Sequence, residues 1–227
     1  MNKAPTFISH HTTINQEISR KLKNGNVKLN FMKLLLTSTG LNNENIKKFF
    51  ISQFDRLDDK TACLVTSGRN EEEQFYIDES VKGLEDLGIK VIEFNIAKHE
   101  SFVNFPLYDI YYVCGGNTFY ILDRMRKTGV DKILINAVKK GKFYLGVSAG
   151  SNIAGPDIEV ANLGDSNDIK LKDLKGLKIV SCIAIPHYNQ KDKNAIEKFK
   201  EKRKGEPVVT LTDDQAIFVE DGKMIQI

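Results

Sequence analysis

The segment with the clearest chemical potential is a G-x-S-x-G pattern, which runs from Gly146 to Gly150 with Ser148 at its centre. It directly follows residues 143–147, an apolar run typical of a buried strand. In a nucleophile elbow, a tight strand-to-helix turn of this composition presents a serine hydroxyl above a sheet, and small neighbours prevent clashes. We therefore predict that Ser148 is a nucleophile. A turn that only packs a helix tightly onto a sheet is the structural alternative.

A serine nucleophile needs a general base, and histidine is the usual one. Beyond residue 31 the chain contains only two histidines, His99 and His187. His99 lies in a charged stretch typical of an exposed loop, whereas His187 follows an apolar run that ends at Ile185. Because functional residues gather at the carboxyl ends of parallel strands, we expect His187 at the same sheet edge as Ser148. This pairing favours a catalytic base over a structural histidine.

A glycine-rich turn supplies the third part of the pattern. Gly115 and Gly116 end another apolar run, and Asn117 and Thr118 follow where a helix is expected to begin. The N–H of Gly116, together with that of Ala149, could stabilise an oxyanion, and each such donor lowers a barrier by roughly 2.7–4 kcal/mol. Gly115, Asn117 and Thr118 are candidate substrate-binding residues. The same turn could instead bind a phosphate or only cap a helix.

The elements that would position these residues alternate along the chain from Met32 onward. Apolar runs predict strands at 33–37, 61–66, 90–94, 109–114, 143–147, 177–185, 208–211, 216–219 and 224–227. Helical spacing predicts helices at 43–54, 71–87, 118–126, 130–140 and 195–203. Continuous apolar strands that alternate with helices indicate a three-layer α/β/α sandwich with a mostly parallel central sheet.

Charge and composition exclude several classes of function. The 227 residues carry a net charge of +3, but residues 1–31 hold five basic residues against one glutamate, so the remainder is close to neutral. We therefore expect no nucleic-acid partner. No apolar run approaches the roughly 20 residues of a membrane span, and we expect no membrane partner.

The three cysteines and the scattered histidines also carry information. Cys63, Cys114 and Cys182 all lie in apolar runs and form no C-x-x-C motif, which is typical of a reducing compartment and predicts a cytoplasmic protein. Isolated histidines and core-type cysteines make no ligand set, so we expect neither a metal nor an organic cofactor.

Taken together, the motifs resemble peptidase E, the aspartyl dipeptidase family, and its relative cyanophycinase. The matching segments are residues 34–38, 115–118, 146–152 and 186–187, whose order and spacing span most of residues 32–227. The resemblance implies the class I glutamine-amidotransferase-like fold, which is flavodoxin-like. It also implies a serine peptidase in which Ser148 is the nucleophile, His187 the base, and Gly116 and Ala149 the oxyanion donors.

The acid of the triad is where the sequence departs from the family pattern. That pattern places an aspartate about fifteen residues after the serine, which corresponds to Leu163 here, and Asp165 lies two residues further on. We therefore predict Asp165 as the acid. Other carboxylates remain alternatives, namely Asp157, Glu159, Asp168, Asp213 and Asp214.

The resemblance also suggests dipeptides with an N-terminal aspartate as substrates. Such a substrate needs a cation for its side chain and an anion for its free amine. Lys191, Lys193 and Arg203 are the candidate cations, although basic residues on a helix usually form a solvated face. The expected partner is a short peptide, and the expected assembly is a monomer or a homodimer.

Three other functions share part of this pattern. An α/β-hydrolase esterase or amidase uses the same elbow but usually has a longer chain. A glutamine amidotransferase would carry a cysteine in place of Ser148. A non-catalytic binding module could use Gly115 and Gly116 for a phosphate. As domains, we expect a disordered or non-native N-terminal extension at 1–31 and a peptidase E-like catalytic domain at 32–227.

Overall fold

A computed structural model describes residues 32–68, 70–98, 107–203 and 205–227. The chain divides after Asn30 into two units, and everything described below belongs to the second. The prediction made for residues 1–31 and the surface position expected for His99 lie outside the described residues.

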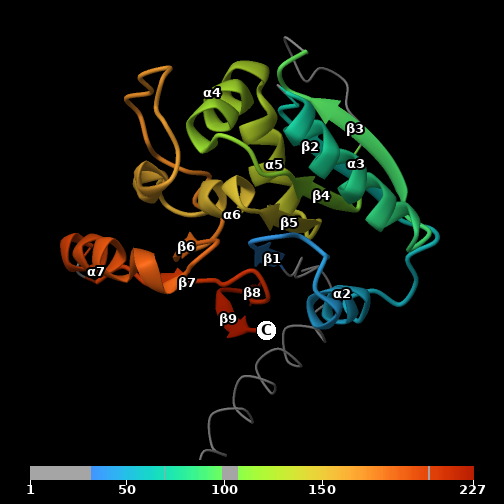
Figure 1. Cartoon of the computed structure of the whole chain (residues 1–227). Coiled ribbons are helices and arrows are strands. Elements are labelled where there is room, and N and C mark those ends of the chain that lie inside the picture. Colours follow the sequence, from blue (N-terminus) through green and yellow to red (C-terminus); the bar gives the residue numbers. More distant parts are fainter. Residues whose placement is uncertain (1–31, 69, 99–106, 204) are drawn as a thin grey trace, which may run out of the picture. The chain divides into compact units, whose positions relative to one another are not determined.

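A seven-stranded sheet forms the centre of the domain, in the order β3-β2-β4-β5-β1-β8-β9 (Figure 1). Its strands are β1 (Lys33–Thr37), β2 (Thr61–Thr66), β3 (Lys90–Asn95), β4 (Ile110–Val113), β5 (Phe143–Val147), β8 (Ala216–Glu220) and β9 (Lys223–Gln226). The first five are parallel, whereas β8 and β9 add an antiparallel edge. The predicted mostly parallel sheet is confirmed.

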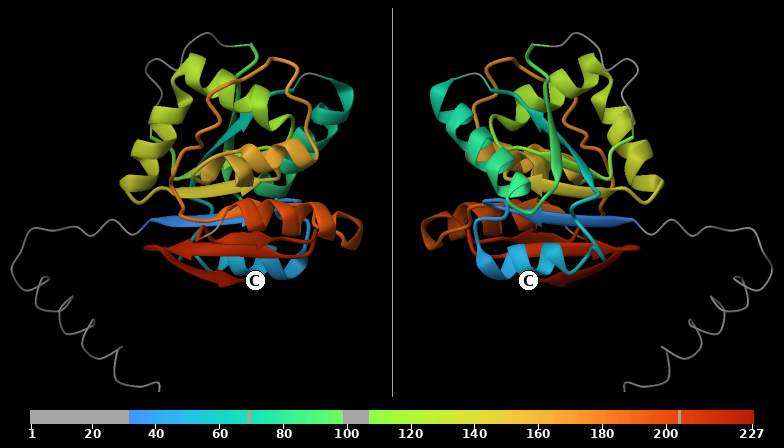
Figure 2. Two further views of the ribbon diagram at one scale, coloured as in Figure 1. Left: turned by 90° about the vertical axis from the view of Figure 1, so that its left-hand side faces the viewer. Right: turned by 90° about the vertical axis from the view of Figure 1, so that its right-hand side faces the viewer.

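Helices cover both faces of this sheet, as the two views of Figure 2 show. They are α2 (Glu44–Ile51), α3 (Glu71–Glu85), α4 (Thr118–Thr128), α5 (Val130–Lys139), α6 (Ala149–Ala154) and α7 (Lys193–Lys202). Helices α2 and α3 bury Ile46, Phe50, Ile77 and Leu84 in one core, while α4, α5 and α6 contribute to a second core on the opposite face. The three-layer sandwich is therefore as predicted.

The chain direction in the sheet explains why chemistry gathers at one edge. Strands β1, β4 and β5 lie side by side and parallel, so their carboxyl ends meet. Ser38 follows the first of these strands, Gly115 lies shortly beyond the second, and Ser148 follows the third. This edge is the location that the topology of open α/β sheets favours for a binding site.

The strand expected at 177–185 is much shorter than predicted and does not join the central sheet. Only Ile183–Ile185 forms a strand, β6, which pairs in parallel with β7 (Val208–Thr210) in a separate two-stranded sheet. Two short 3₁₀ helices, η1 (Glu159–Leu163) and η2 (Gln190–Asp192), lie in the connections on either side of β6. Leu177, Ile179 and Val180 are buried in the core in an irregular segment, so their apolar character reflects burial rather than strand pairing.

The carboxyl-terminal hairpin is the other feature that the sequence predicted directly. Strands β8 and β9 pair antiparallel, with Glu220 opposite Lys223. Asp221 and Gly222 both adopt positive φ, at 50° and 78°, as a tight two-residue hairpin turn requires.

A helix that crosses a bilayer needs some twenty apolar residues, and no helix within the described ranges satisfies that requirement.

Candidate active site

The backbone of Ser148 has the strained geometry of an elbow. Its φ and ψ are 51° and −111°, a conformation that residues with a side chain rarely adopt. It stands between the end of β5 and the first turn of α6, and its N–H donates to the carbonyl of Thr37 at 3.0 Å. Strain of this kind persists only where the surrounding structure imposes it, and it gathers at functional sites.

Two glycines make this turn possible because they allow backbone segments to approach closely. A Cβ atom on Gly150 would lie 2.3 Å from the carbonyl oxygen of Val113, and one on Gly146 would lie 2.8 Å from the carbonyl oxygen of Gly150. Both distances are far inside van der Waals contact. The two glycines of the pattern are therefore required by packing between β5, β4 and α6.

Ser151 fastens the elbow to the neighbouring strand. Its fully buried hydroxyl group lies 2.8 Å from the carbonyl oxygens of both Thr37 and Gly146, and it accepts the N–H of Thr37 at 3.0 Å. The hydroxyl of Tyr144 donates to the carbonyl of Gly150 at 2.8 Å. These buried contacts fix the turn that carries Ser148.

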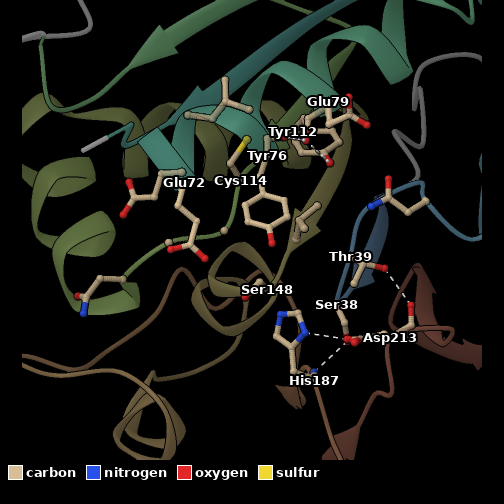
Figure 3. A pocket seen from close by; sticks show the side chains of 18 of the residues that line it. Ser38, Thr39, Glu72, Tyr76, Glu79, Tyr112, Cys114, Ser148, His187 and Asp213 are labelled. Atoms are coloured by element: carbon tan, nitrogen blue, oxygen red, sulfur yellow. Dashed lines mark hydrogen bonds and ion pairs between the residues drawn. The ribbon is translucent and has the colours of Figure 1, made fainter. Parts of the chain in front are cut away.

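His187 reaches the site from the small sheet rather than from the central one. It follows β6 by two residues, has a φ of 56°, and its N–H donates to Ser38 Oγ at 3.0 Å. The expectation that both residues follow strands of one sheet was wrong, because β6 pairs with β7. Even so, His187 and Ser148 line the same cavity, and Figure 3 shows the imidazole beside the serine.

Asp213 is the carboxylate that contacts the imidazole. Its Oδ1 lies 2.7 Å from His187 Nδ1, and its main-chain carbonyl accepts a hydrogen bond from Thr39 Oγ1 at 2.9 Å. The two side chains are 49% and 66% exposed, so solvent screens the charge between them. The contact therefore acts mainly by fixing the orientation and tautomer of the ring.

Asp165, which we expected to be the acid, occupies a different place. Its Oδ2 accepts the main-chain N–H of Thr118 at 2.9 Å at the start of α4. Asn117 caps the same helix by accepting the N–H of Tyr120, and its amide donates to the carbonyl of Ser166 at 2.8 Å. Asp165 lines the same cavity as Ser148, but the carboxylate at hydrogen-bonding distance from the imidazole is Asp213.

The remaining candidate acids have other partners. Asp157 and Glu159 both form ion pairs with Arg203, and Asp168 contacts the hydroxyl of Ser166. Asp214, next to the carboxylate that contacts the ring, contacts the hydroxyl of Thr212.

Two cavities meet at the nucleophile. The larger, of about 690 Å³, is lined by Ser148 and His187 together with residues that follow β1 and β4 and with one side of α3. The smaller, of about 330 Å³, shares Ser148, His187 and Asp165 but extends towards η1 and α7. The site is therefore an open crevice with two arms, large enough for a short peptide.

The glycine turn after β4 and the first residue of α6 both border Ser148. A Cβ atom on Gly115 would lie 3.2 Å from the Cβ of Ser148, so this glycine lets the β4 turn approach the nucleophile closely. Gly116 has a φ of 131° and also lines the larger cavity. Ala149 is the first residue of α6, and its N–H has no acceptor within the helix. Thr118, by contrast, is buried and lines only the smaller cavity.

Helix α3 forms a wall that the sequence analysis did not assign to the site. Glu72, Glu73, Tyr76 and Glu79 line the larger cavity, and Figure 3 shows three of them on the side opposite His187. No lysine or arginine stands among the described residues that line this cavity. In the sequence, the spacing of these α3 residues resembles that of any exposed helix face. Only the tertiary structure reveals that this face borders the nucleophile.

The three candidate cations differ in their position relative to the two cavities. Lys191 lines the smaller cavity. Lys193 is exposed at the start of α7 and lines neither cavity. Arg203 pairs with Asp157, Glu159 and Glu206 and lies over the ring of Phe199, so it ties the end of α7 to η1.

The cysteines offer no competing nucleophile. All three are free and buried, and burial raises the pKa of the Cys63 thiol to about 12. Burial likewise raises the pKa of Cys114, which lines the larger cavity beside Gly115. Thiols with such pKa values stay protonated at neutral pH and react poorly. Among the described residues, no three His, Cys, Asp or Glu side chains cluster so as to hold a metal ion.

Comparison with known proteins decides the family. The sequence profile described as Peptidase family S51 matches residues 34–227. The chain belongs to peptidase family S51. It is therefore a serine-type peptidase, and the resemblance to peptidase E that the motifs suggested is confirmed at the level of the family.

Individual relatives agree with this assignment. An uncharacterized peptidase of Listeria monocytogenes is 31% identical over 200 residues, which cover 85% of this chain and 96% of that protein. Peptidase E of Nostoc is 28% identical over 86% of this chain and 81% of its own length. A crystal structure from Listeria monocytogenes, of a protein provisionally named peptidase E, superposes with a TM-score of 0.74 at 29% identity and covers 87% of this chain and 98% of its own.

Proposed function

We propose that this family S51 peptidase hydrolyses short peptides with a Ser148–His187–Asp213 triad. The observation that carries the proposal is the 2.7 Å contact between Asp213 Oδ1 and His187 Nδ1, on an imidazole that shares a cavity with the strained Ser148. Asp213 takes the role that we first predicted for Asp165.

The mechanism follows from where each group stands. A hydrogen bond from His187 Nδ1–H to Asp213 leaves Nε2 unprotonated, so Nε2 can accept the proton of Ser148 as Oγ attacks the peptide carbonyl. The N–H groups of Gly116 and Ala149 stabilise the resulting oxyanion. The imidazolium then protonates the leaving amine, the C–N bond breaks, and an acyl-enzyme remains on Ser148.

The second half of the reaction reverses these roles. His187 removes a proton from a water molecule, the hydroxide attacks the ester carbonyl, and Ser148 recovers its proton as the acid product leaves. Ser148 lies in an open crevice rather than in a closed cavity, which suits short peptides with free ends. The proposed substrate-binding residues are Gly115 and Asn117, which line the larger cavity, and Thr118, which lines the smaller one.

A preference for N-terminal aspartate depends on a cation near the crevice. Lys191 is the only one of the three candidate cations that lines either cavity, whereas the described wall of the larger one carries carboxylates. An aspartate side chain would therefore bind in the smaller cavity, towards Lys191. Loss of selectivity for Asp over Asn dipeptides in Lys191→Ala would support this placement, and unchanged selectivity would remove it.

We propose a cytoplasmic location for the protein. Three buried free cysteines favour a reducing compartment such as the cytoplasm. We also keep the proposals of a monomer or homodimer, and of a catalytic domain that begins near Met32 after an N-terminal extension.

A serine-directed fluorophosphonate probe tests the triad without knowledge of the substrate. We expect the wild type to be labelled covalently, and Ser148→Ala and His187→Ala to remain unlabelled although folded. Labelling of Ser148→Ala at the wild-type level would remove this residue as the nucleophile. Hydrolysis of a dipeptide panel by the same three proteins then identifies the substrate.

A further inference from the structure

Tyr76 is an exposed aromatic residue on the wall of the catalytic crevice. Tyr76 and its neighbour Phe75 are each 60% exposed, more than any other large hydrophobic residue in the described part of the chain. Tyr76 lines the larger cavity together with Ser148 and His187, whereas Phe75 lines neither cavity. An aromatic ring in water gains free energy when a bound molecule covers it. The ring of Tyr76 is therefore available to a substrate.

The contacts of Tyr76 leave its ring face open to the crevice. Phe75 packs edge-on against it, with ring centroids 5.5 Å apart and an angle of 77° between the planes. Figure 3 shows the Tyr76 side chain extending from α3 towards His187. Within the described ranges, Tyr76 takes part in hydrogen bonds through its main chain, whose carbonyl accepts from Ser80 Oγ at 2.8 Å, and not through its hydroxyl.

Apolar groups also border the larger cavity where the sheet ends. Val147 is the last residue of β5, Cys114 directly follows β4, and both line this cavity together with Tyr112. Cys114 and Tyr112 are 6% and 3% exposed, so they belong to the edge of the core. A large side chain that enters the cavity of about 690 Å³ would therefore meet an aromatic wall and an apolar floor.

The two arms of the crevice indicate which part of a peptide reaches this ring. Both cavities meet at Ser148, and the proposed function places the side chain of the first residue in the smaller one, towards Lys191. The chain on the other side of the scissile bond then extends from Ser148 into the larger cavity. Its first residue is the leaving residue, and Tyr76 is the exposed aromatic group on that side.

We propose that Tyr76 stacks against the side chain of the leaving residue and makes the enzyme selective for an aromatic one. This assignment rests on the proposed function and names Tyr76 as a specificity-determining residue. Paired rings attract each other beyond the effect of the apolar area they bury. A glycine at the same position would leave the ring of Tyr76 in water.

The carboxylates beside Tyr76 sharpen this selectivity. Glu72 and Glu79 are four residues before and three residues after Tyr76, so all three lie on one face of α3 and line the larger cavity. An acidic leaving residue would face two like charges there. Phenylalanine avoids that repulsion, whereas lysine is the competitor that the carboxylates rather than the ring would favour.

The test uses substrates that differ only in the leaving residue. The dipeptide amides Asp-Phe, Asp-Lys and Asp-Gly form one series, and the corresponding Ala dipeptide amides form a second. Amidation removes the terminal carboxylate, and ratios within a series do not depend on the first residue. We expect the wild type to prefer phenylalanine to glycine in kcat/KM by about 10- to 100-fold, and to prefer phenylalanine to lysine.

Variants assign this preference to the ring. Tyr76→Ala should lower kcat/KM for the phenylalanine substrates about tenfold and for the glycine substrates less than about twofold. Tyr76→Phe keeps the ring and should retain the preference. The control is Ile225→Ala, which removes a side chain that is 51% exposed and lies outside both cavities, and it should change neither rate. Thermal unfolding checks that each variant is folded.

A second measurement needs no hydrolysis. Phenylalaninamide is the product that the leaving residue would form, so it should occupy the larger cavity and slow fluorophosphonate labelling of Ser148. We expect this protection in the wild type and in Tyr76→Phe, and its loss in Tyr76→Ala at the same concentration. Glycinamide should protect none of the three proteins.

Two results would overturn the inference. Equal losses on the phenylalanine and glycine substrates in Tyr76→Ala would give the ring no part in selecting the leaving residue. A preference for lysine over phenylalanine that survives in Tyr76→Ala would assign the selection to the carboxylates of α3. Labelled wild type with neither a phenylalanine preference nor protection by phenylalaninamide overturns only this inference, whereas absence of labelling overturns the proposed function and the inference with it.

Discussion

The serine elbow and the histidine–aspartate pair are built in opposite ways. Ser148 stands on a turn packed by glycines and fastened by fully buried hydrogen bonds. His187 and Asp213 follow β6 and β7, the two strands of the separate small sheet. Their side chains are 49% and 66% exposed. The nucleophile is thus fixed by close packing, whereas its base is oriented by a few exposed contacts.

This difference predicts how each part responds to substitution. Changes in the elbow should unfold or distort the protein, because many buried groups depend on it. Changes in the His187–Asp213 pair should abolish catalysis while stability stays near that of the wild type.

The largest effect should come from His187→Ala. Removal of the base should lower kcat by about 10⁴- to 10⁶-fold, and because the side chain is half exposed the melting temperature should move by less than about 3 °C. Steady-state kinetics and calorimetry measure both. A drop in melting temperature as large as that of the elbow variants would contradict the contrast.

The next largest effect should be the loss of stability caused by Gly150→Ala. The added methyl group would meet the carbonyl of Val113 at 2.3 Å, and the cost should be roughly 2–4 kcal/mol of unfolding free energy. Denaturant unfolding measures it. The control is Gly83→Ala in α3, where a Cβ meets nothing within 4 Å and helix propensity should stabilise by up to about 1 kcal/mol.

Ser151→Ala should have an intermediate effect on stability. The change removes a hydroxyl that bridges Thr37 and Gly146 and leaves the N–H of Thr37 without its acceptor, at a cost of about 1–3 kcal/mol. Unfolding in urea reports this loss. If Ser151→Ala is as stable as the wild type, the elbow is held by backbone packing alone.

Thiol reagents should have the smallest effect, because they should leave the peptidase activity of the folded enzyme unchanged. Burial raises the pKa of Cys63 to about 12 and also raises that of Cys114, so both thiols remain protonated at pH 7–9. Iodoacetamide should leave peptidase activity unchanged in the folded enzyme and modify all three cysteines after unfolding. Rapid inactivation at pH 7 would show that Cys114 is accessible from the cavity.

The same contrast explains what the sequence could predict. Gly146, Ser148 and Gly150 form a local pattern whose meaning depends only on the strand before it and the helix after it, and the structure has both. In the same way, continuous apolar runs predicted the strands of the sheet, and helical periodicity predicted the helices that cover it. These features need no knowledge of distant contacts.

Long-range contacts set the rest of the site. Asp213 is near the carboxyl end of the chain and meets His187 only because β7 pairs with β6, a contact that no local pattern indicates. The apolar run at 177–185 resembled one long strand because burial in an irregular segment gives the same composition. The carboxylates of α3 face the cavity through packing that the helix sequence does not encode.

The central claim is that Asp213, not another carboxylate, orients His187. The most direct test is the rate constant for phosphonylation of Ser148 by a fluorophosphonate in Asp213→Asn, with Asp214→Asn as the neighbouring control. We predict a rate about 10²- to 10⁴-fold lower in Asp213→Asn and a rate near that of the wild type in Asp214→Asn. An unchanged rate in Asp213→Asn, with a slow rate in Asp165→Asn, would contradict the account.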